Sequence, residues 1–339
     1  MKKIFITGGF GYLGSKLALE AVTRGFSVFM YDSLIYKQDY KKILALIEDQ
    51  KKDGATCRFI IGDTRNTELL KASLLDFKPD FLFHFAELAG IYICNENPSY
   101  TSDINYTASK DVLNLAEELD IPVIYNSTSS LYGNQKDTKL LNEAASLPEP
   151  TDNYSKYKKM MEEYIAAKRE TNKNFKIIVL RPATVWGVSP RMRLELLPNH
   201  FTYCARSKGL IKISEPEAFR AEIDIDDITL CYLKIMEKSQ WPKDIYNIGH
   251  HNLKKMDVAK IIQSIINCKI EPIGNLGDSR NLQIDSSAFS GDFGWKPENS
   301  FENTVDKVKK WLDSNIEEIE RSNYAGIINT PLSEWYKII

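Results

Sequence analysis

TGGFGYLGS, residues 7–15, connects a short apolar run at residues 3–7 to an amphipathic stretch that begins at residue 13. Gly8, Gly11 and Gly14 recur every three residues in this segment. Glycines at this spacing let the chain turn tightly and bring backbone N–H groups close to a pyrophosphate at the start of the next helix. The segment therefore predicts a strand–turn–helix unit that binds a dinucleotide.

The rest of the first half repeats this alternation of strand and helix. Such alternation predicts an α/β fold, a Rossmann-type doubly wound parallel sheet with helices on both faces. The second half is less regular, which favours a smaller mixed α/β substrate domain beside the sheet. We expect the first domain to comprise residues 1–180 and 223–249, and the second to comprise 181–222 and 250–330. The expected strands are 3–7, 27–31, 58–61, 80–85, 123–126 and 176–180, and the expected helices are 13–24, 40–50, 67–75, 101–119 and 154–170.

Composition excludes several classes of protein. The net charge is −2, with 43% hydrophobic and 27% charged residues, which is typical of a globular protein and not of a nucleic-acid binder. No apolar run approaches the ~18 residues that a membrane helix needs, and the apolar start breaks too early for a signal peptide. The five cysteines are scattered and never in C-x-x-C spacing. We therefore expect reduced thiols, no metal site and a cytoplasmic location.

The second predicted strand ends at Tyr31-Asp32-Ser33. An acid at this position can accept hydrogen bonds from both ribose hydroxyls of a dinucleotide and repels a 2′-phosphate. No arginine follows closely, so Asp32 favours NAD over NADP. Lys37 keeps NADP open as the alternative.

Ten ordered segments resemble the extended short-chain dehydrogenases/reductases, the family of nucleotide-sugar epimerases and dehydratases. The resemblance covers nearly the whole chain and implies an NAD-binding first domain and a nucleotide-sugar-binding second domain. The segments are GGFGYLG (8–14), IIGDTRN (60–66), FLFHFAE (81–87), STSSLYG (127–133), NYSKYK (153–158), LRPATVWG (180–187), RAEIDIDDI (220–228), YNIG (246–249), DSRNLQID (278–285) and FGWKP (293–297).

The resemblance implies a set of cofactor-binding residues. Asp63 would contact adenine, and Phe85, Ala86 and Asn105 would lie beside the nicotinamide. His84 is expected to be a core histidine. The complete expected set is Gly8, Gly11, Tyr12, Leu13, Gly14, Asp32, Asp63, Thr64, Phe85, Ala86, Asn105, Ser127, Tyr154, Lys158 and Ala183.

The catalytic residues are expected in NYSKYKK, residues 153–159. A tyrosine precedes a lysine by four residues at five places, so the spacing alone selects none of them. Only Tyr154/Lys158 follows the proline-rich approach that the family carries, here residues 147–150. One helical turn places both side chains on the same face, where the lysine charge favours tyrosinate. Thr128 would complete the group. The other pairs are Tyr12/Lys16, Tyr106/Lys110, Tyr132/Lys136 and Tyr164/Lys168.

The implied reaction is oxidation at the C4 hydroxyl of a nucleotide sugar. Tyr154 would remove the hydroxyl proton while hydride passes to NAD. Ser129-Ser130 replace the Asp-Glu pair of dehydratases, and no cysteine lies near Thr128 as in reductases of the GDP-fucose-synthase type. Two outcomes stay open: release of the 4-keto sugar by a 4-dehydrogenase, which is the main prediction, or return of the hydride to the opposite face by a 4-epimerase. A catalytically silent NAD-binding regulator is the third alternative.

The segment 188–205 resembles GDP-heptose 4-dehydrogenases of bacterial surface-polysaccharide synthesis, which favours a GDP-sugar as substrate. Arginines suit a diphosphate because they offer a fork of N–H donors. The expected substrate-binding residues are Glu87, Thr128, Thr184, Arg191, Arg193, Asn199, Arg220 and Arg280.

The family also pairs two helices across a two-fold axis, so a homodimer is expected through residues 101–119 and 154–170. Each helix carries an apolar stripe that could form this interface. The alternative is that both stripes pack against the sheet. The stripes are Val112, Leu115 and Leu119 on the first helix, and Met160, Met161, Tyr164 and Ile165 on the second.

Overall fold

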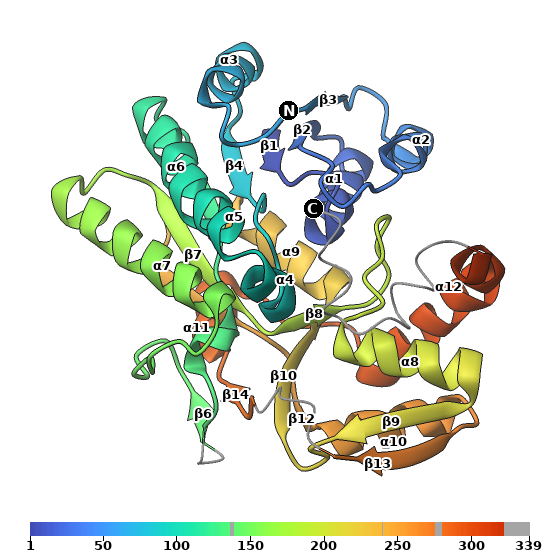
Figure 1. Cartoon of the computed structure of the whole chain (residues 1–339). Coiled ribbons are helices and arrows are strands. Elements are labelled where there is room, and N and C mark those ends of the chain that lie inside the picture. The colour runs from blue at the N-terminus through green and yellow to red at the C-terminus, as the bar shows by residue number, and fades with distance from the viewer. Residues whose placement is uncertain (136–138, 239, 275–279, 322–339) are drawn as a thin grey trace.

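The computed structural model describes residues 1–135, 139–238, 240–274 and 280–321. At its centre lies a seven-stranded parallel sheet of order β3-β2-β1-β4-β5-β7-β11 (Figure 1). The predicted α/β fold with a Rossmann-type doubly wound sheet is confirmed. The strands are β1 (Lys3–Thr7), β2 (Ser27–Asp32), β3 (Cys57–Ile61), β4 (Phe81–His84), β5 (Val123–Asn126), β7 (Ile177–Pro182) and β11 (Ile245–Ile248).

The strand order reverses between β1 and β4. From β1 the chain continues outward to β2 and β3, and it then returns to place β4 on the other side of β1. Thr7 at the end of β1 is therefore in register with Tyr31 on one side and His84 on the other. The connections on the two sides lead away from each other at this point, which leaves a crevice at the carboxyl ends of the strands.

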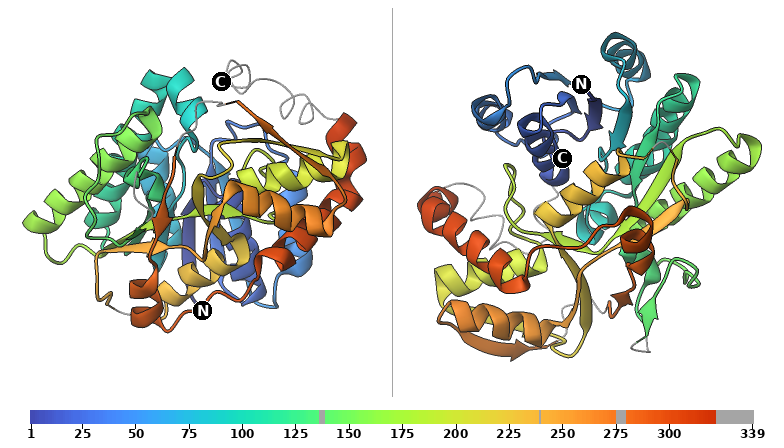
Figure 2. Two further views of the ribbon diagram at one scale, coloured as in Figure 1. Left: turned by 90° about the horizontal axis from the view of Figure 1, so that it is seen from below. Right: turned by 180° about the vertical axis from the view of Figure 1, so that it is seen from behind.

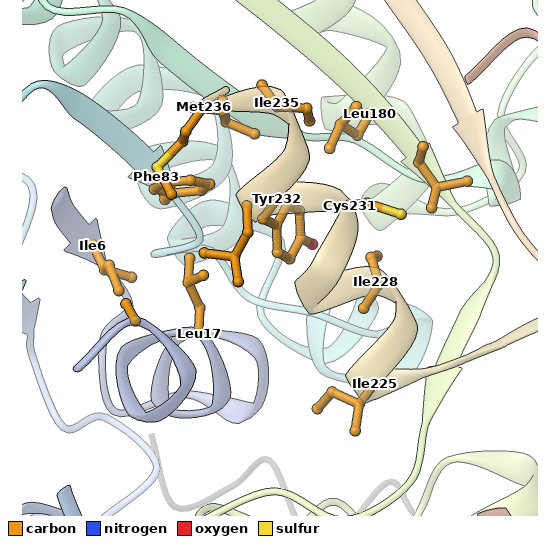
Figure 3. Packing of buried hydrophobic residues seen from close by; sticks show 14 of the residues in the cluster. Ile6, Leu17, Phe83, Leu180, Ile225, Ile228, Cys231, Tyr232, Ile235 and Met236 are labelled. Carbon is orange, nitrogen blue, oxygen red and sulfur yellow. The ribbon is translucent and has the colours of Figure 1, made fainter. Parts of the chain in front are cut away.

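Different helices cover the two faces of the sheet, because alternate side chains of a strand point to opposite faces. Ile4, Ile6 and Phe83 belong to one buried cluster, whereas Phe5 and Leu82 belong to the other. Figure 3 shows the first cluster, in which one helix places Cys231, Tyr232 and Ile235 close to the strand residues Phe83 and Leu180. That face carries α1 (Tyr12–Thr23), α2 (Tyr40–Gln50) and α9 (Ile225–Ile235), and the opposite face carries α3 (Thr67–Phe77), α6 (Ser109–Glu118) and α7 (Asn153–Thr171).

The helix expected at residues 101–119 is divided into several segments. Pro98 opens a short helix, and the backbone widens into a π-helix before α6 begins. The Ser109 hydroxyl donates to the Ile104 carbonyl five residues earlier, at 3.0 Å, which matches the wider π-type turn. The segments are α5 (Pro98–Ser102), η1 (Asp103–Ala108) and α6, and a separate short helix, α4 (Ile91–Glu96), precedes them.

The rest of the chain forms smaller sheets and further helices. Residues 197–214, 255–273 and 301–321 surround a separate apolar cluster, whereas residues 282–295 pack into the first cluster. Figure 2 shows from behind that the helices around the separate cluster lie away from α3, α6 and α7. The predicted domain boundaries remain a prediction, and residues 322–330 lie outside the described residues. The elements are β8 (Thr184–Trp186), β10 (Phe219–Asp224) and β12 (His251–Lys254) in one sheet, β9 (Leu210–Ser214) with β13 (Lys269–Ile273), β6 (Leu140–Leu141) with β14 (Gln283–Ile284), the 3-10 turn η2 (Ser129–Tyr132), and α8 (Leu197–Lys208), α10 (Lys255–Ile265), α11 (Ser287–Phe293) and α12 (Phe301–Arg321).

The apolar stripes on α6 and α7 are largely buried within the protein itself. Val112, Met161 and Ile165 are at most 1% exposed and pack with the sheet residues of the second cluster. Leu115, Leu119 and Tyr164 are partly buried against the same cluster. At Met161 the stripe therefore packs against the sheet, as in the stated alternative, because the sheet needs this residue as part of its covering layer.

Candidate active site

The glycine loop between β1 and α1 forms one wall of the crevice. Gly8 has a φ of +70°, and a Cβ at this position would come within 2.7 Å of the Phe85 carbonyl carbon. No side chain caps the start of α1 at Gly11, so the first N–H groups of the helix face the cleft. A bare loop and an uncapped helix N-terminus fit a pyrophosphate, so the residues present suit a dinucleotide.

Asp32 lies at the end of β2 and lines the same cleft. Its carboxylate accepts hydrogen bonds from the backbone N–H groups of Phe10 at 2.9 Å and Leu34 at 2.8 Å, and from the Gln38 amide at 3.2 Å. Burial raises its pKa, while these hydrogen bonds and the Arg191 charge oppose the rise. A carboxylate offers about four lone-pair positions, so Asp32 retains acceptor capacity for a ribose hydroxyl.

Asp63, expected to contact adenine, lines the cleft and binds Arg65 in a bidentate pair. Arg65 donates to its two oxygens at 3.0 and 2.8 Å. Burial opposes ionisation of Asp63, but these bonds hold its pKa below the usual value. The Tyr31 hydroxyl donates to the Asp63 carbonyl at 2.9 Å and fixes this turn against β2.

Thr128, Tyr154 and Lys158 meet in the cleft, as the sequence predicts. Asp152 caps α7 by accepting from the Ser155 N–H at 2.8 Å, so the helix starts one residue before Tyr154. Lys158 follows one turn later, and its ammonium donates to the Asn126 carbonyl at the end of β5. A strand end and a helix start thus bring the three side chains together.

The other Tyr/Lys pairs have different partners. Lys16 forms an ion pair with Asp226 at 2.5 Å, and Lys168 forms one with Glu117. Lys110 lies 4.7 Å from the centre of the Tyr106 ring. The Tyr132 hydroxyl donates to the Asn247 amide oxygen at 2.8 Å, and Lys136 lies outside the described residues.

The Tyr154 phenol has a raised pKa in this structure. Burial is the largest cause, while the Lys158 charge and a hydrogen bond with Thr128 act in the opposite direction. Glu87 and Cys94 raise the pKa further. The lysine therefore favours the tyrosinate as expected, but a nearby carboxylate counteracts it.

Glu87 makes contacts that the sequence does not predict. Its side chain lines the cleft, yet it forms a buried ion pair with Lys158 and accepts from Tyr125 Oη at 2.9 Å. It also accepts from the Ser109 hydroxyl at 3.3 Å. Both carboxylate oxygens thus have protein partners, and a contact between Glu87 and substrate remains a prediction.

His84 lies beneath this group and is fully buried. Its ring contacts Thr7 Oγ1 at 2.7 Å through Nδ1 and Ser109 Oγ at 2.9 Å through Nε2. Burial is the main cause of a pKa lowered to about 3, with the Lys158 charge adding to it. The ring is therefore neutral at physiological pH, which agrees with the predicted core role.

Two expected site residues lie behind the cleft. The Asn105 amide exchanges hydrogen bonds of 2.8 Å with the backbone of Leu88, and the Asn199 amide oxygen accepts from the Gly187 N–H at 3.1 Å. Both side chains are fully buried and do not line the cleft. The predictions that Asn105 contacts cofactor and that Asn199 contacts substrate are not supported, because each amide is used to hold a loop.

Other expected cofactor residues line the cleft, but two of them have side chains bound elsewhere. The Tyr12 hydroxyl donates to the Gly187 carbonyl at 2.8 Å, and the Ser127 hydroxyl donates to Glu162 at 2.5 Å. The remaining cleft-lining residues of the expected set are Leu13, Gly14, Thr64, Phe85, Ala86, Ala183 and, on the substrate side, Thr184.

The four candidate arginines all line the cleft, at different positions. Arg280 donates to the Ser130 hydroxyl at 2.9 Å, two residues after Thr128, which places it beside the catalytic group. Arg193 pairs with Glu195 at 2.6 Å and donates to the Ala89 carbonyl at 3.1 Å. Arg220 is 5% exposed and donates to its neighbour's carbonyl, that of Phe219, at 3.1 Å.

Arg191 lies in the part of the cleft that contains Tyr36 and Asp32. Its guanidinium carbon is 4.9 Å from the centre of the Tyr36 ring, and its charge acts on Asp32. Arg191, expected to bind the substrate diphosphate, therefore lies near the dinucleotide ribose position. Sequence reasoning missed this placement because the loop that carries Arg191 is more than 150 residues from Asp32 along the chain.

Sequence reasoning also missed Ser130 and Tyr36 as cleft residues. Ser130 lies in STSSLYG, and the sequence argument uses it only against dehydration, because a serine has no carboxylate. Its position two residues after Thr128 is the signal that could have found it. Tyr36 follows Leu34, a non-glycine residue with a φ of +56°, and no sequence pattern predicts that turn.

A glycine-rich dinucleotide loop and a Thr–Tyr–Lys group in one cleft define a class of nucleotide-dependent enzyme. Residues 4–249 match the NAD dependent epimerase/dehydratase family, and the chain belongs to that family. The predicted membership of the extended short-chain dehydrogenases/reductases is confirmed. None of the helices that the structure describes combines the length and apolar character needed to span a bilayer.

Among similar proteins are Protein CapI of Staphylococcus aureus and a UDP-glucose 4-epimerase of Lactobacillus helveticus. Both are 25% identical; the first match covers 91% of this chain and 98% of CapI, the second 92% and 98%. Among solved structures, a UDP-glucose-4-epimerase from Stenotrophomonas maltophila with bound NAD has a TM-score of 0.83 at 18% identity, covering 94% of this chain and 100% of that one. A dTDP-glucose 4,6-dehydratase from Bacillus anthracis in complex with NAD has a TM-score of 0.81 at 21% identity, covering 94% and 98%. These structures share the fold of this chain.

Proposed function

We propose that this protein is an NAD-dependent nucleotide-sugar 4-epimerase. The observation that carries the proposal is the meeting of Thr128, Tyr154 and Lys158 at the carboxyl edge of the sheet, in the cleft that the glycine loop also lines. Relatives named as UDP-glucose 4-epimerases, matched over nearly their full length, support epimerisation over net oxidation.

Each of the three residues Thr128, Tyr154 and Lys158 has a separate role in the proposed reaction. NAD, when bound, supplies the hydride acceptor and donor and a positively charged ring. Tyr154 takes the proton from the C4 hydroxyl of the sugar. It returns this proton after the sugar ring has turned its opposite face to the cofactor. Thr128 holds the same hydroxyl by a hydrogen bond, and the Lys158 charge stabilises the tyrosinate.

Two arginines from the second half of the chain suit the diphosphate of the substrate. Arg280 lies beside Ser130 and Arg220 lines the same cleft, and guanidinium groups bind phosphate through paired N–H donors. Arg191 lies at the Asp32 end, so we assign it to the cofactor side. Ser129 and Ser130 supply no carboxylate beside Thr128, which does not favour 4,6-dehydration.

A 4-dehydrogenase that acts on a GDP-heptose-like sugar for surface-polysaccharide synthesis is the second candidate. It is supported by the resemblance of segment 188–205 alone. A silent NAD-binding regulator is disfavoured, because Tyr154 and Lys158 are both present and both line the cleft. A cytoplasmic location and a homodimer remain predictions.

One experiment separates these candidates. The purified protein is incubated with NAD and with UDP-, GDP-, CDP- and dTDP-hexoses or heptoses in turn, while absorbance at 340 nm and the sugar products are followed. An epimerase gives the C4 epimer with no net NADH, whereas a dehydrogenase gives NADH and 4-keto sugar in equal amounts. Neither product with any nucleotide sugar, from protein that binds NAD, would contradict both enzymatic proposals.

A further inference from the structure

Glu87 is a buried carboxylate directly behind the Tyr–Lys pair. Its side chain is 4% exposed and that of its partner Lys158 is 5% exposed. One oxygen pairs with the lysine, and the other accepts from Tyr125 and Ser109. A buried charge is tolerated when it is paired and hydrogen-bonded, and both conditions hold here.

This arrangement fixes the Lys158 ammonium before any ligand binds. One N–H is directed to the Asn126 carbonyl and another to Glu87, and the ammonium lies 4.8 Å from the centre of the Tyr125 ring. An ammonium has three N–H donors, so one remains for a ligand in the cleft. The lysine therefore has one orientation, set by β5 on one side and by Glu87 on the other.

Three of the other ionisable groups packed around Tyr154 and Lys158 are neutral near pH 7, while Glu162, whose charge acts on Tyr125, is paired with Arg181. Burial is the main cause of a Cys94 pKa raised to about 12 and a His84 pKa lowered to about 3. Burial likewise raises the Tyr125 pKa well above its ordinary value. Arg220 and Arg280, which line the same cleft, carry fixed positive charges.

We propose that Glu87 is a positioning residue for the catalytic pair: it fixes the Lys158 ammonium and cancels part of its charge, so that Tyr154 keeps its proton until a further positive charge enters the cleft. The role rests on the proposed function, in which Tyr154 is the base. Because Glu87 offsets the Lys158 charge, Tyr154 loses its proton only when the positively charged nicotinamide ring is also in the cleft. Without Glu87, the lysine charge would act on the phenol in full.

The direct test is the pKa of Tyr154 in the ligand-free protein. Tyrosine labelled with carbon-13 at Cζ reports phenol ionisation by NMR, and Tyr154→Phe identifies the relevant signal. Glu87→Gln keeps the shape of the side chain and removes its charge. Because the Lys158 charge is then unopposed, the Tyr154 pKa should fall by about one unit or more.

Tyr125→Phe is the matched control. It removes the 2.9 Å hydrogen bond to Glu87 but keeps the carboxylate and the ion pair. The Tyr154 pKa should stay at the wild-type value in this variant, although Glu87 has lost a contact. A purely structural role for Glu87 predicts no fall in Glu87→Gln, so an unchanged or increased Tyr154 pKa in that variant overturns the proposal.

If Glu87→Gln does not fold, the double variant Glu87→Gln/Lys158→Gln replaces both buried charges together. Since two opposing charges are removed at once, its Tyr154 pKa should rise by less than about one unit. A larger rise would mean that the lysine acted without opposition, and it overturns the proposal. None of these measurements needs a substrate, so a fall in the Tyr154 pKa in a protein that converts no nucleotide sugar would reject the proposed function and keep the role of Glu87.

Discussion

Tyr154 and Lys158 reach the cleft because Asp152 starts α7 at the right residue. Tyr164 and Lys168 have the same spacing on the same helix, but they lie three turns further on. There the Tyr164 hydroxyl donates to Asn114 at 2.6 Å, and Lys168 pairs with Glu117. Identical spacing thus gives a pair that lines the cleft at one end of the helix and a pair with structural partners at the other.

Replacing Tyr154 by Phe should abolish most of the activity. We expect a loss of at least about 10²-fold in turnover, the usual effect of removing a general base, with normal folding and retained NAD binding. Tyr164→Phe is the control, since it removes a hydroxyl from the same helix outside the cleft, and its turnover should match wild type. Turnover near the wild-type value in Tyr154→Phe would reject the catalytic assignment.

The residue-level predictions from sequence succeed where a side chain belongs to a local motif. Gly8, Asp32, Thr128 and Tyr154 each lie in a turn or strand end whose geometry follows from neighbouring residues, and all line the cleft. Asn105 illustrates the opposite case, because its direction depends on how the π-helical η1 packs on the loop at Leu88. That packing joins distant segments, and no local pattern encodes it.

At the scale of elements, a buried ion pair joins α7 to β7. Glu162 accepts from Arg181 through both of its oxygens, at 3.0 and 2.5 Å, and both side chains are at most 6% exposed. The same glutamate accepts from Ser127, next to Thr128, and Arg181 donates to Tyr132 at 3.0 Å. The pair therefore holds α7, β7 and the turn at Thr128 together.

Glu162→Ala should lower the free energy of unfolding by about 3–5 kcal/mol, because it leaves Arg181 buried without its counter-charge. Denaturant unfolding monitored by circular dichroism measures this change. Glu163→Ala is the matched control: Glu163 is the next residue on α7 and is exposed, so its effect should stay within about 0.5 kcal/mol. Equal effects of the two substitutions would show that the buried pair contributes nothing beyond helix propensity.

Strand β10 carries another buried carboxylate, that of Glu222, which does not receive hydrogen bonds as Glu162 does within the described residues. Glu222 is fully buried, and within the described residues neither of its oxygens has a hydrogen-bond partner. Burial raises its pKa from 4.5 to about 8, with the Arg220 charge opposing the rise. The folded protein thus holds this proton to a higher pH than the unfolded chain does.

The consequence is a loss of stability as pH rises. Between pH 4.5 and about 8 the folded state binds more protons than the unfolded state, so the wild-type free energy of unfolding should fall by up to about 1.4 kcal/mol per pH unit. Glu222→Gln stays neutral and should lack this contribution, so the variant should gain on wild type at pH 8 relative to pH 5. Unfolding curves at both pH values test this, with the exposed Glu217→Gln as control. A constant difference between Glu222→Gln and wild type across this range would contradict the assignment.

For the whole molecule, six of the seven strands of the parallel sheet could be predicted because each is a short apolar run between turn residues, whereas β11 was not predicted. The split of the helix expected at 101–119 could not, since Pro98 and the π-type turn act through contacts with the adjacent loop. The arrangement of the second half was also missed in detail, because β8, β10 and β12 pair across long stretches of chain. The placement of Arg191 near Asp32 belongs to the same class of long-range contact.

The predicted homodimer is a property of the whole molecule, and the structure limits which surfaces of α6 and α7 could form it. The stripes on α6 and α7 are mostly committed to the sheet, so a dimer on these helices would have to use their exposed outer face. Ala166 and Ala167 are exposed on α7, and small side chains allow close approach of a second helix.

Light scattering at micromolar concentration should give about twice 38.8 kDa if the dimer forms. Ala166→Arg should then shift the mass toward the monomer, whereas Ser264→Arg, on the exposed face of α10 away from α7, should leave it unchanged (Figure 1). A wild-type mass near 38.8 kDa would reject the dimer.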